Sequence, residues 1–279
     1  MKPAPFEYER PDDLDGLIAL MRSEDLFVKM LAGGQSLGPM LNLRLVQPDL
    51  LVDITAIPEL KRVEENSDAV VLGACVTHAD IEDRRVPDAT GGALPRVARA
   101  IAYRAVRNRG TLGGSLAHAD PAADWVSCLA AIGAEVLILG ASGRRTVPVD
   151  EFMTGVFQVA LEPGELVEAV RIPRLSRGAR WGFHKIARKT GEMAQAIGAV
   201  LHDMERGILR AVIGATESVP IVFSDAAALF GGNPEAGLAK AYDAGAAARA
   251  LDDAGITDPV GRQLHLVALK RAINQAAQR

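Results

Sequence analysis

Two short segments constrain this chain more than any other feature, because each combines a pair of glycines with polar residues. The first is AGGQS at residues 32–36, and the second is TLGGS at residues 111–115. Glycine lacks a Cβ and tolerates positive φ, so successive N–H groups can turn inward and form an anion-binding concavity. A diphosphate offers two anionic groups, one for each segment. We therefore expect a dinucleotide between the segments, with a structural β-turn as the alternative reading of each.

The common nucleotide-binding and catalytic motifs do not fit. Residues 37–39 (LGP) interrupt a GxGxxG pattern, and no lysine follows the second segment, so Rossmann and P-loop sites are disfavoured. The sequence also lacks HExxH, GxSxG and a paired Cys/His cluster. His118, Asp120 and Asp124 are alternative metal ligands or acid–base partners. A polar helix entrance is favoured there, because Asp120 before Pro121 is typical of a helix N-terminus.

Charge and composition exclude several classes of protein. The net charge of −4 argues against nucleic-acid binding, although Arg104, Arg107 and Arg109 make a local basic patch. No apolar run approaches the roughly 18 residues of a membrane span, and residues 1–13 resemble neither a signal peptide nor an anchor. The two cysteines are far apart in the sequence. They predict free thiols in a cytoplasmic protein, and they cannot supply the four ligands of a four-cysteine iron–sulfur cluster.

The hydrophobic pattern predicts an α+β protein with two parts. Short strands alternate with helices in the first half, and residues 173–179 (PRLSRGA) have the composition of a linker. An antiparallel pair of strands and two helices follow. The expected strands are 27–31, 50–54, 69–72, 136–139, 146–149, 166–172, 194–203 and 208–215; the expected helices are 12–21, 77–83 (capped by Thr77), 94–107, 122–132, 236–252 and 259–277.

Four groups of motifs, in order along nearly the whole chain, resemble a known family. They are AGGQSL with LRL and LLVDI (residues 32–37, 43–45 and 50–54), RNRGTLGGSLAHADPAADW (107–125), EPGELVEAVRIP (162–173) and HKIARKTGEMA (184–194). Together they resemble the flavin-binding medium subunit of molybdenum hydroxylases. That family includes carbon monoxide and xanthine dehydrogenases and enzymes that hydroxylate nicotine, quinoline or caffeine.

The resemblance implies a fold of the p-cresol methylhydroxylase type. Residues 1–175 would then form an FAD-binding domain, with α/β subdomains at about 1–55 and 56–175 that enclose an extended FAD. Residues 176–279 would form a C-terminal α+β domain with an antiparallel sheet, closing over the cofactor.

The resemblance also assigns cofactor-binding residues, with no catalytic acid or base and no metal ligand among them. The FAD is implied to be non-covalent. Asp124 matches a position near the ADP-side ribose, Leu161 one near the adenine, and Ile101 and Lys185 positions near the isoalloxazine. A cation at Lys185 would stabilise an anionic reduced flavin. Met193 replaces an aromatic residue common in relatives and would cover the ring less rigidly. The implied pyrophosphate contacts are Ala32, Gly33, Gly34, Gln35, Ser36 and Leu37 from the first segment, and Thr111, Leu112, Gly113, Gly114 and Ser115 from the second.

In function, the resemblance implies the flavoprotein subunit of a molybdenum hydroxylase. Its FAD would accept electrons from the [2Fe–2S] clusters of a small iron–sulfur subunit and pass them to an external acceptor. Substrate would be hydroxylated on a large molybdopterin subunit, and the complex would be a dimer of heterotrimers. The alternative is a stand-alone FAD-dependent oxidase or reductase of the same fold, which would need its own substrate pocket.

Overall fold

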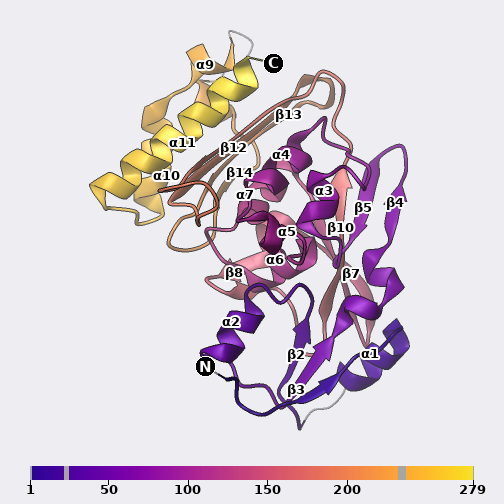
Figure 1. The fold of residues 1–279 in the computed structure, drawn as a ribbon. Helices are drawn as coiled ribbons and strands as arrows, with labels where there is room; N and C mark the ends of the chain where they lie inside the picture. The colour runs from indigo at the N-terminus through magenta and orange to yellow at the C-terminus, as the bar shows by residue number, and fades with distance from the viewer. Residues whose placement is uncertain (1, 22–24, 232–236, 279) are drawn as a thin grey trace.

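The computed structural model describes residues 2–21, 25–231 and 237–278, and its strands form three main sheets (Figure 1). The N-terminal sheet is parallel, in the order β1 (Glu7–Glu9), β3 (Leu50–Asp53), β2 (Val28–Leu31). Leu50 and Val52 of the central strand pack with Leu17 of α1 (Leu14–Met21) in a small core. The end of β2 leads directly into the first Gly-Gly segment.

The second sheet is antiparallel and has the order β4-β5-β10-β6-β7. Its strands are β4 (Val63–Glu65), β5 (Ala69–Gly73), β6 (Glu135–Gly140), β7 (Gly143–Pro148) and β10 (Leu166–Pro173). Every residue of β5 is buried, as expected for a strand covered on both faces. The strands expected at residues 136–139 and 146–149 flank a Gly-Ala-Ser-Gly turn, and they pair as the β6–β7 hairpin, which closes between Gly140 and Gly143.

The third sheet is also antiparallel, in the order β11-β12-β13-β14. Its strands are β11 (Arg180–Ile186), β12 (Ala196–Asp203), β13 (Ile208–Gly214) and β14 (Ile221–Phe223). The central pair was predicted; the outer two strands were not. One face packs against α7 (Asp124–Ile132) and the other against α11 (Pro259–Ala277).

Glycines in the third sheet explain how α11 approaches it so closely. A Cβ built on Gly182 would lie 1.9 Å from the carbonyl oxygen of Ala272, and one on Gly198 would lie 2.5 Å from that of Ala268. The backbone of α11 therefore rests almost directly on β11 and β12, as glycine and alanine allow. Ala268, Ala272 and Ala276 of this helix are completely buried.

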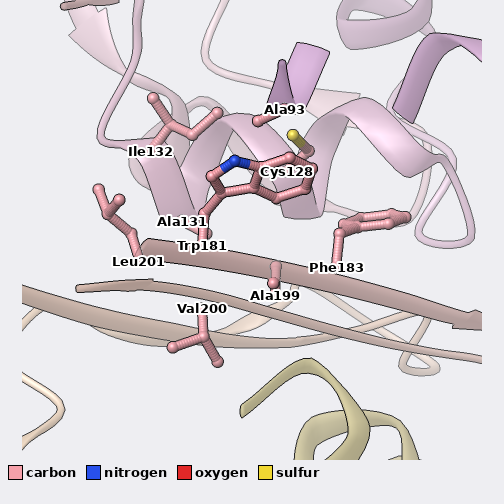
Figure 2. A pocket seen from close by; sticks show the side chains of 10 residues that line it. Ala93, Cys128, Ala131, Ile132, Trp181, Phe183, Ala199, Val200 and Leu201 are labelled. Carbon is pink, nitrogen blue, oxygen red and sulfur yellow. The ribbon is translucent and has the colours of Figure 1, made fainter. Parts of the chain in front are cut away.

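Helix α7 is the structural centre of the molecule, because all nine of its residues are buried. A helix covered on every side must be apolar around its circumference, and this one (DWVSCLAAI) nearly is. Figure 2 shows Trp181, Phe183 and Leu201 of the third sheet pointing toward α7, while Val200 points the other way. The gap left at this seam is about 10 Å³. That is room for about one water molecule at most, and not for an organic substrate.

The single helix predicted for residues 94–107 is wrong. The structure has α4 (Ala93–Ala100) and α5 (Arg104–Arg107), separated at Ile101 by extended backbone and at Ala102 by a φ of 41°. The guanidinium of Arg107 donates to the carbonyl oxygens of both Ile101 and Ala102, at 2.8 and 3.0 Å. These bonds replace the ones a continuous helix would have made, so the break is stable.

Two further helix boundaries differ from the prediction. Asp120 does not cap α7, which begins at Asp124; the Asp120 carboxylate instead accepts from the Ala122 N–H in a local turn. The helix predicted over 236–252 is divided into α9 (Leu238–Ala241) and α10 (Ala244–Asp253), because Asp243 leaves the helix and caps α10. Its predicted first residue, Ala236, lies outside the described residues.

The remaining elements are short. Among the described residues, none of the helices is both long and apolar enough to cross a membrane. The remaining helices are α2 (Leu37–Asn42), α3 (His78–Glu82), α6 (Leu112–His118) and α8 (Val149–Phe152), the remaining strands are β8 (Met153–Gly155) and β9 (Gln158–Val159), and single 3₁₀ turns lie at Ile54–Ala56, Pro58–Lys61, Met204–Arg206 and Ala227–Phe230.

Candidate functional site

The first Gly-Gly segment has free backbone donors. It connects β2 to α2, and Gly34 adopts a φ of 71°, which an L side chain rarely tolerates. Within the described chain, the N–H groups of Gly33, Gly34, Gln35 and Ser36 have no protein acceptor. The Gln35 side chain donates to the Gly33 carbonyl oxygen at 3.0 Å and holds the turn. Successive unpaired N–H groups in a turn can bind an anion.

The second Gly-Gly segment is the first turn of α6 rather than a loop, which corrects the predicted two-sided nest. The N–H groups of its last four residues, 112–115, are already used. Those of Leu112 and Gly113 donate to the carbonyl oxygens of Val76 and Ala74, and those of Gly114 and Ser115 donate to the Thr111 hydroxyl and carbonyl oxygens. This segment therefore cannot offer a series of free backbone donors to an anion.

Gly33 and Gly113 also allow close packing. A Cβ on Gly33 would lie 2.1 Å from the carbonyl oxygen of Arg109, and one on Gly113 would lie 2.4 Å from the Ala74 Cβ. A Cβ on Gly114 would be 3.7 Å from the Ala32 Cβ. The structure therefore brings the two segments into direct contact, although they are far apart in the sequence.

Lys185 and Asp124 form a buried ion pair. The Lys185 Nζ lies 2.8 Å from Asp124 Oδ2, and the two side chains are only 11% and 6% exposed. The other oxygen of Asp124 is buried without a hydrogen-bond partner among the described residues. Burial raises the pKa of Asp124, and the Lys185 charge opposes that rise. The sequence placed these residues toward opposite ends of an extended FAD. Because the two side chains contact each other, they cannot lie at opposite ends of the cofactor, and at most one of the two assignments can hold.

Ile101 and Met193 lie on neighbouring segments. Ile101 is half-buried at the break between α4 and α5. A Cβ on Gly191 would lie 3.0 Å from the Tyr103 ring and 3.1 Å from the Ala102 carbonyl oxygen, so the turn before Met193 rests on that break. Met193 is 56% exposed. Leu161, in contrast, is half-buried against the main core after β9.

Sequence reasoning missed the pair formed by His78 and Trp125. The Trp125 indole N–H donates to His78 Nδ1 at 3.1 Å, and the His78 backbone N–H donates to the Gly110 carbonyl oxygen at 2.9 Å. A Cβ on Gly110 would lie 2.8 Å from His78 Nε2. The imidazole therefore supports the backbone just before Thr111. The sequence signal was Gly110 itself, whose lack of a side chain this contact requires.

The His78 imidazole gives a pH-dependent stability. Burial, aided by the charge of Arg107, lowers its pKa from 6.5 to about 4. The unfolded chain therefore binds more protons than the folded one between these values, and stability falls as pH drops through that window. We expect His78 to account for a loss of about 3 kcal/mol between pH 7 and pH 4.

Urea unfolding of the wild type and of His78→Gln at several pH values measures this contribution. Glutamine can accept from Trp125 but takes up no proton, so the variant should show a smaller loss at acid pH. Parallel pH profiles for the two proteins would contradict the assignment.

Other predicted candidates have structural partners. The His118 ring packs at 5.0 Å, centroid to centroid, from the Phe157 ring. In the ranges that the structure describes, no group of three or more His, Cys, Asp or Glu residues could hold a metal ion. The first segment therefore offers several N–H groups without an acceptor among the described residues, and it lies beside the second segment. This arrangement suits a ligand that carries phosphate.

Comparison with known proteins identifies the family. A family model described as the FAD binding domain in molybdopterin dehydrogenase matches residues 4–175. The chain belongs to this family. Similar members include the carbon monoxide dehydrogenase medium chain of Hydrogenophaga pseudoflava, 39% identical over 72% of this chain and 70% of the relative. The caffeine dehydrogenase subunit beta of a Pseudomonas species is 36% identical over 72% of this chain and 68% of the relative.

Solved structures agree along the whole chain. A carbon monoxide dehydrogenase from Hydrogenophaga pseudoflava, in a form that lacks the Mo-pyranopterin moiety, matches with a TM-score of 0.87 and 34% identity. The match covers 99% of this chain and 98% of the other. Quinoline 2-oxidoreductase from Pseudomonas putida 86 matches with a TM-score of 0.85 and 33% identity, over 100% and 99%. The predicted family and α+β class are confirmed, and the protein is an oxidoreductase subunit with an FAD-binding domain.

Proposed function

We propose that this chain is the medium subunit of a molybdenum hydroxylase complex, in which electrons from a partner's [2Fe–2S] clusters reach FAD and then an external acceptor. The carrying observation is the first Gly-Gly segment. Its backbone donors have no acceptor among the described residues, and it lies beside a second segment in which the N–H groups of residues 112–115 are used. FAD, when bound, supplies the redox chemistry. The end-to-end likeness to carbon monoxide dehydrogenase supports the same role.

The residues of this chain bind and orient the cofactor. In this proposal residues 32–37 hold the diphosphate through the N–H groups of Gly33 to Ser36, and residues 111–115 support them from behind and add the Ser115 hydroxyl. The Lys185–Asp124 pair ties β11 to α7. The pair thereby joins the C-terminal sheet to the cofactor-binding part of the chain, and in this proposal it lies near the flavin.

The domain division follows from the same proposal. Residues 1–175, with subdomains at about 1–55 and 56–175, would bind FAD, and residues 176–279 would close over it. The three sheets fall into these three stretches, which supports the division. The linker is hydrogen-bonded to the parts of the chain before and after it. The Leu175 N–H donates to the Ala89 carbonyl oxygen, and the Ser176 N–H donates to the Asp203 carboxylate.

The number of cysteines supports placing the iron–sulfur clusters on a partner subunit. Cys75 and Cys128 are free and buried in different places, and two cysteines cannot hold a four-cysteine cluster. We place the clusters on a small subunit and molybdopterin on a large one, in a dimer of heterotrimers. Two unpaired thiols also fit a cytoplasmic compartment.

Reconstitution tests this function. The isolated chain should bind FAD non-covalently, so that acid precipitation leaves the yellow colour in solution. It should oxidise no small substrate until an iron–sulfur subunit and a molybdopterin subunit are added. Substrate turnover by the purified chain alone would favour the stand-alone oxidase instead, and a chain that binds no FAD would refute both.

A further inference from the structure

The diphosphate site described above has backbone donors but no cation within its two segments. Residues 32–37 (AGGQSL) and 111–115 (TLGGS) contain no basic side chain. A diphosphate carries a negative charge on each phosphate, and hydrogen bonds to a charged group are stronger when the donor is itself charged. Because the N–H groups of residues 112–115 are already bonded within the protein, a cationic donor on that side would come from another residue.

The basic patch formed by Arg104, Arg107 and Arg109 contains one guanidinium that has no ion pair or hydrogen bond with the described residues. Arg104 is paired with Glu82 and Asp83, and Arg107 is paired with Glu82 while it also donates to the Ile101 and Ala102 carbonyl oxygens. Arg109 is exposed, and across the described ranges its side chain has no ion pair or hydrogen bond. The charges of the first two arginines are therefore neutralised locally, and that of Arg109 is not.

Arg109 lies at the junction of the two segments. Its carbonyl oxygen and carbon would be 2.1 and 2.7 Å from a Cβ on Gly33, and the next residue, Gly110, rests on the His78 imidazole. The backbone of Arg109 is thus fixed against the first segment on one side and leads into the second on the other. A long side chain starting from this fixed point can reach an anion held by the first segment.

Building on the FAD binding proposed above, we propose that the Arg109 guanidinium is the cationic donor to the FAD diphosphate. It supplies the charge that the second segment lacks. The guanidinium has several N–H donors in a planar fork that suits phosphate oxygens, whereas lysine offers a point charge. Arg109 is accordingly a binding residue for the diphosphate and takes no part in flavin chemistry.

Binding measurements on the full-length apo chain test this inference. Arg109→Gln should weaken FAD binding about ten- to a hundred-fold, which is the range for loss of a charged hydrogen bond. Arg109→Lys should recover part of the affinity. Riboflavin, which lacks phosphate, should bind all three proteins equally, and ADP should compete less well in Arg109→Gln. The control is Arg99→Gln, since Arg99 is exposed on α4 and likewise has no ion pair within the described chain.

The outcomes separate the two proposals. Wild-type FAD affinity in Arg109→Gln overturns the role of Arg109 while the FAD-binding function stands. An equal loss of riboflavin and FAD affinity overturns it too, because the residue would then act on the fold. A wild-type chain that binds no FAD overturns both. Loss of FAD affinity in Arg99→Gln to the same extent would show general surface charge in place of a specific contact.

Discussion

Replacing Gly33 with alanine should abolish retention of FAD, with affinity lowered at least about a hundred-fold. The added Cβ would lie 2.1 Å from the carbonyl oxygen of Arg109 and 2.8 Å from the Cα of Gly110, and both are backbone atoms that cannot rotate away. The two segments must therefore separate, which moves the N–H groups of residues 33–36 from their present positions. Cofactor sites depend on geometry held within about half an ångström. FAD content after purification and fluorescence titration of the apo chain measure the effect.

Gly38→Ala is the matched control for this substitution. Gly38 lies close by in α2, and a Cβ there would meet nothing within 4 Å. FAD binding should be unchanged, and stability should rise by up to about 1 kcal/mol, because alanine favours the helix over glycine. Far-UV circular dichroism should show both variants folded, since overpacking at one site costs only about 1–3 kcal/mol. Full FAD retention by Gly33→Ala would show that the contact between the segments is unimportant.

The correctly predicted elements are those that local chemistry determines. The capping box of α3 follows from Thr77 and Asp80, which bond to each other's backbone N–H groups. The β6–β7 hairpin follows from two short strand segments that flank a Gly-Ala-Ser-Gly turn. The break between α4 and α5 could not be predicted in this way. The apolar pattern continues through it, and the bonds that stabilise it come from Arg107, whose acceptors no periodicity shows.

The candidate site was predictable in part for a similar reason. Glycine pairs show where backbone can approach something closely, but not what it approaches. At Gly113 that neighbour is Ala74, and at Gly33 it is the backbone of Arg109. The N–H groups of Leu112 and Gly113 donate to the carbonyl oxygens of Val76 and Ala74, and these long-range bonds form only in the tertiary structure. The Lys185–Asp124 contact joins residues 61 positions apart and has no pattern in the sequence.

Replacing Lys185 with methionine should destabilise the folded apo chain by about 3–5 kcal/mol at neutral pH. Asp124 would keep its burial and lose its only partner among the described side chains, since its other oxygen already has none. The double variant Asp124→Asn/Lys185→Met should lose less, because no uncompensated charge stays buried. Lys189→Met is the control: Lys189 pairs with Glu192 at the surface, where such pairs contribute about 1 kcal/mol or less.

The pH dependence of Lys185→Met provides the sharper test of the ion pair. Burial raises the pKa of Asp124 and the positive charge of Lys185 opposes that rise, so removing Lys185 raises this pKa further. A folded-state pKa above the unfolded value means that the folded protein binds the proton more tightly. The penalty of the variant should therefore be small below the unfolded pKa of about 4. It should grow as pH rises through the folded value, so urea unfolding should give a larger difference from wild type at pH 8 than at pH 5. If the free energy of unfolding differed from wild type by the same amount at both pH values, the variant would disturb packing alone. A buried Asp124 carboxylate without its partner would instead take up a proton between these pH values and make the difference depend on pH.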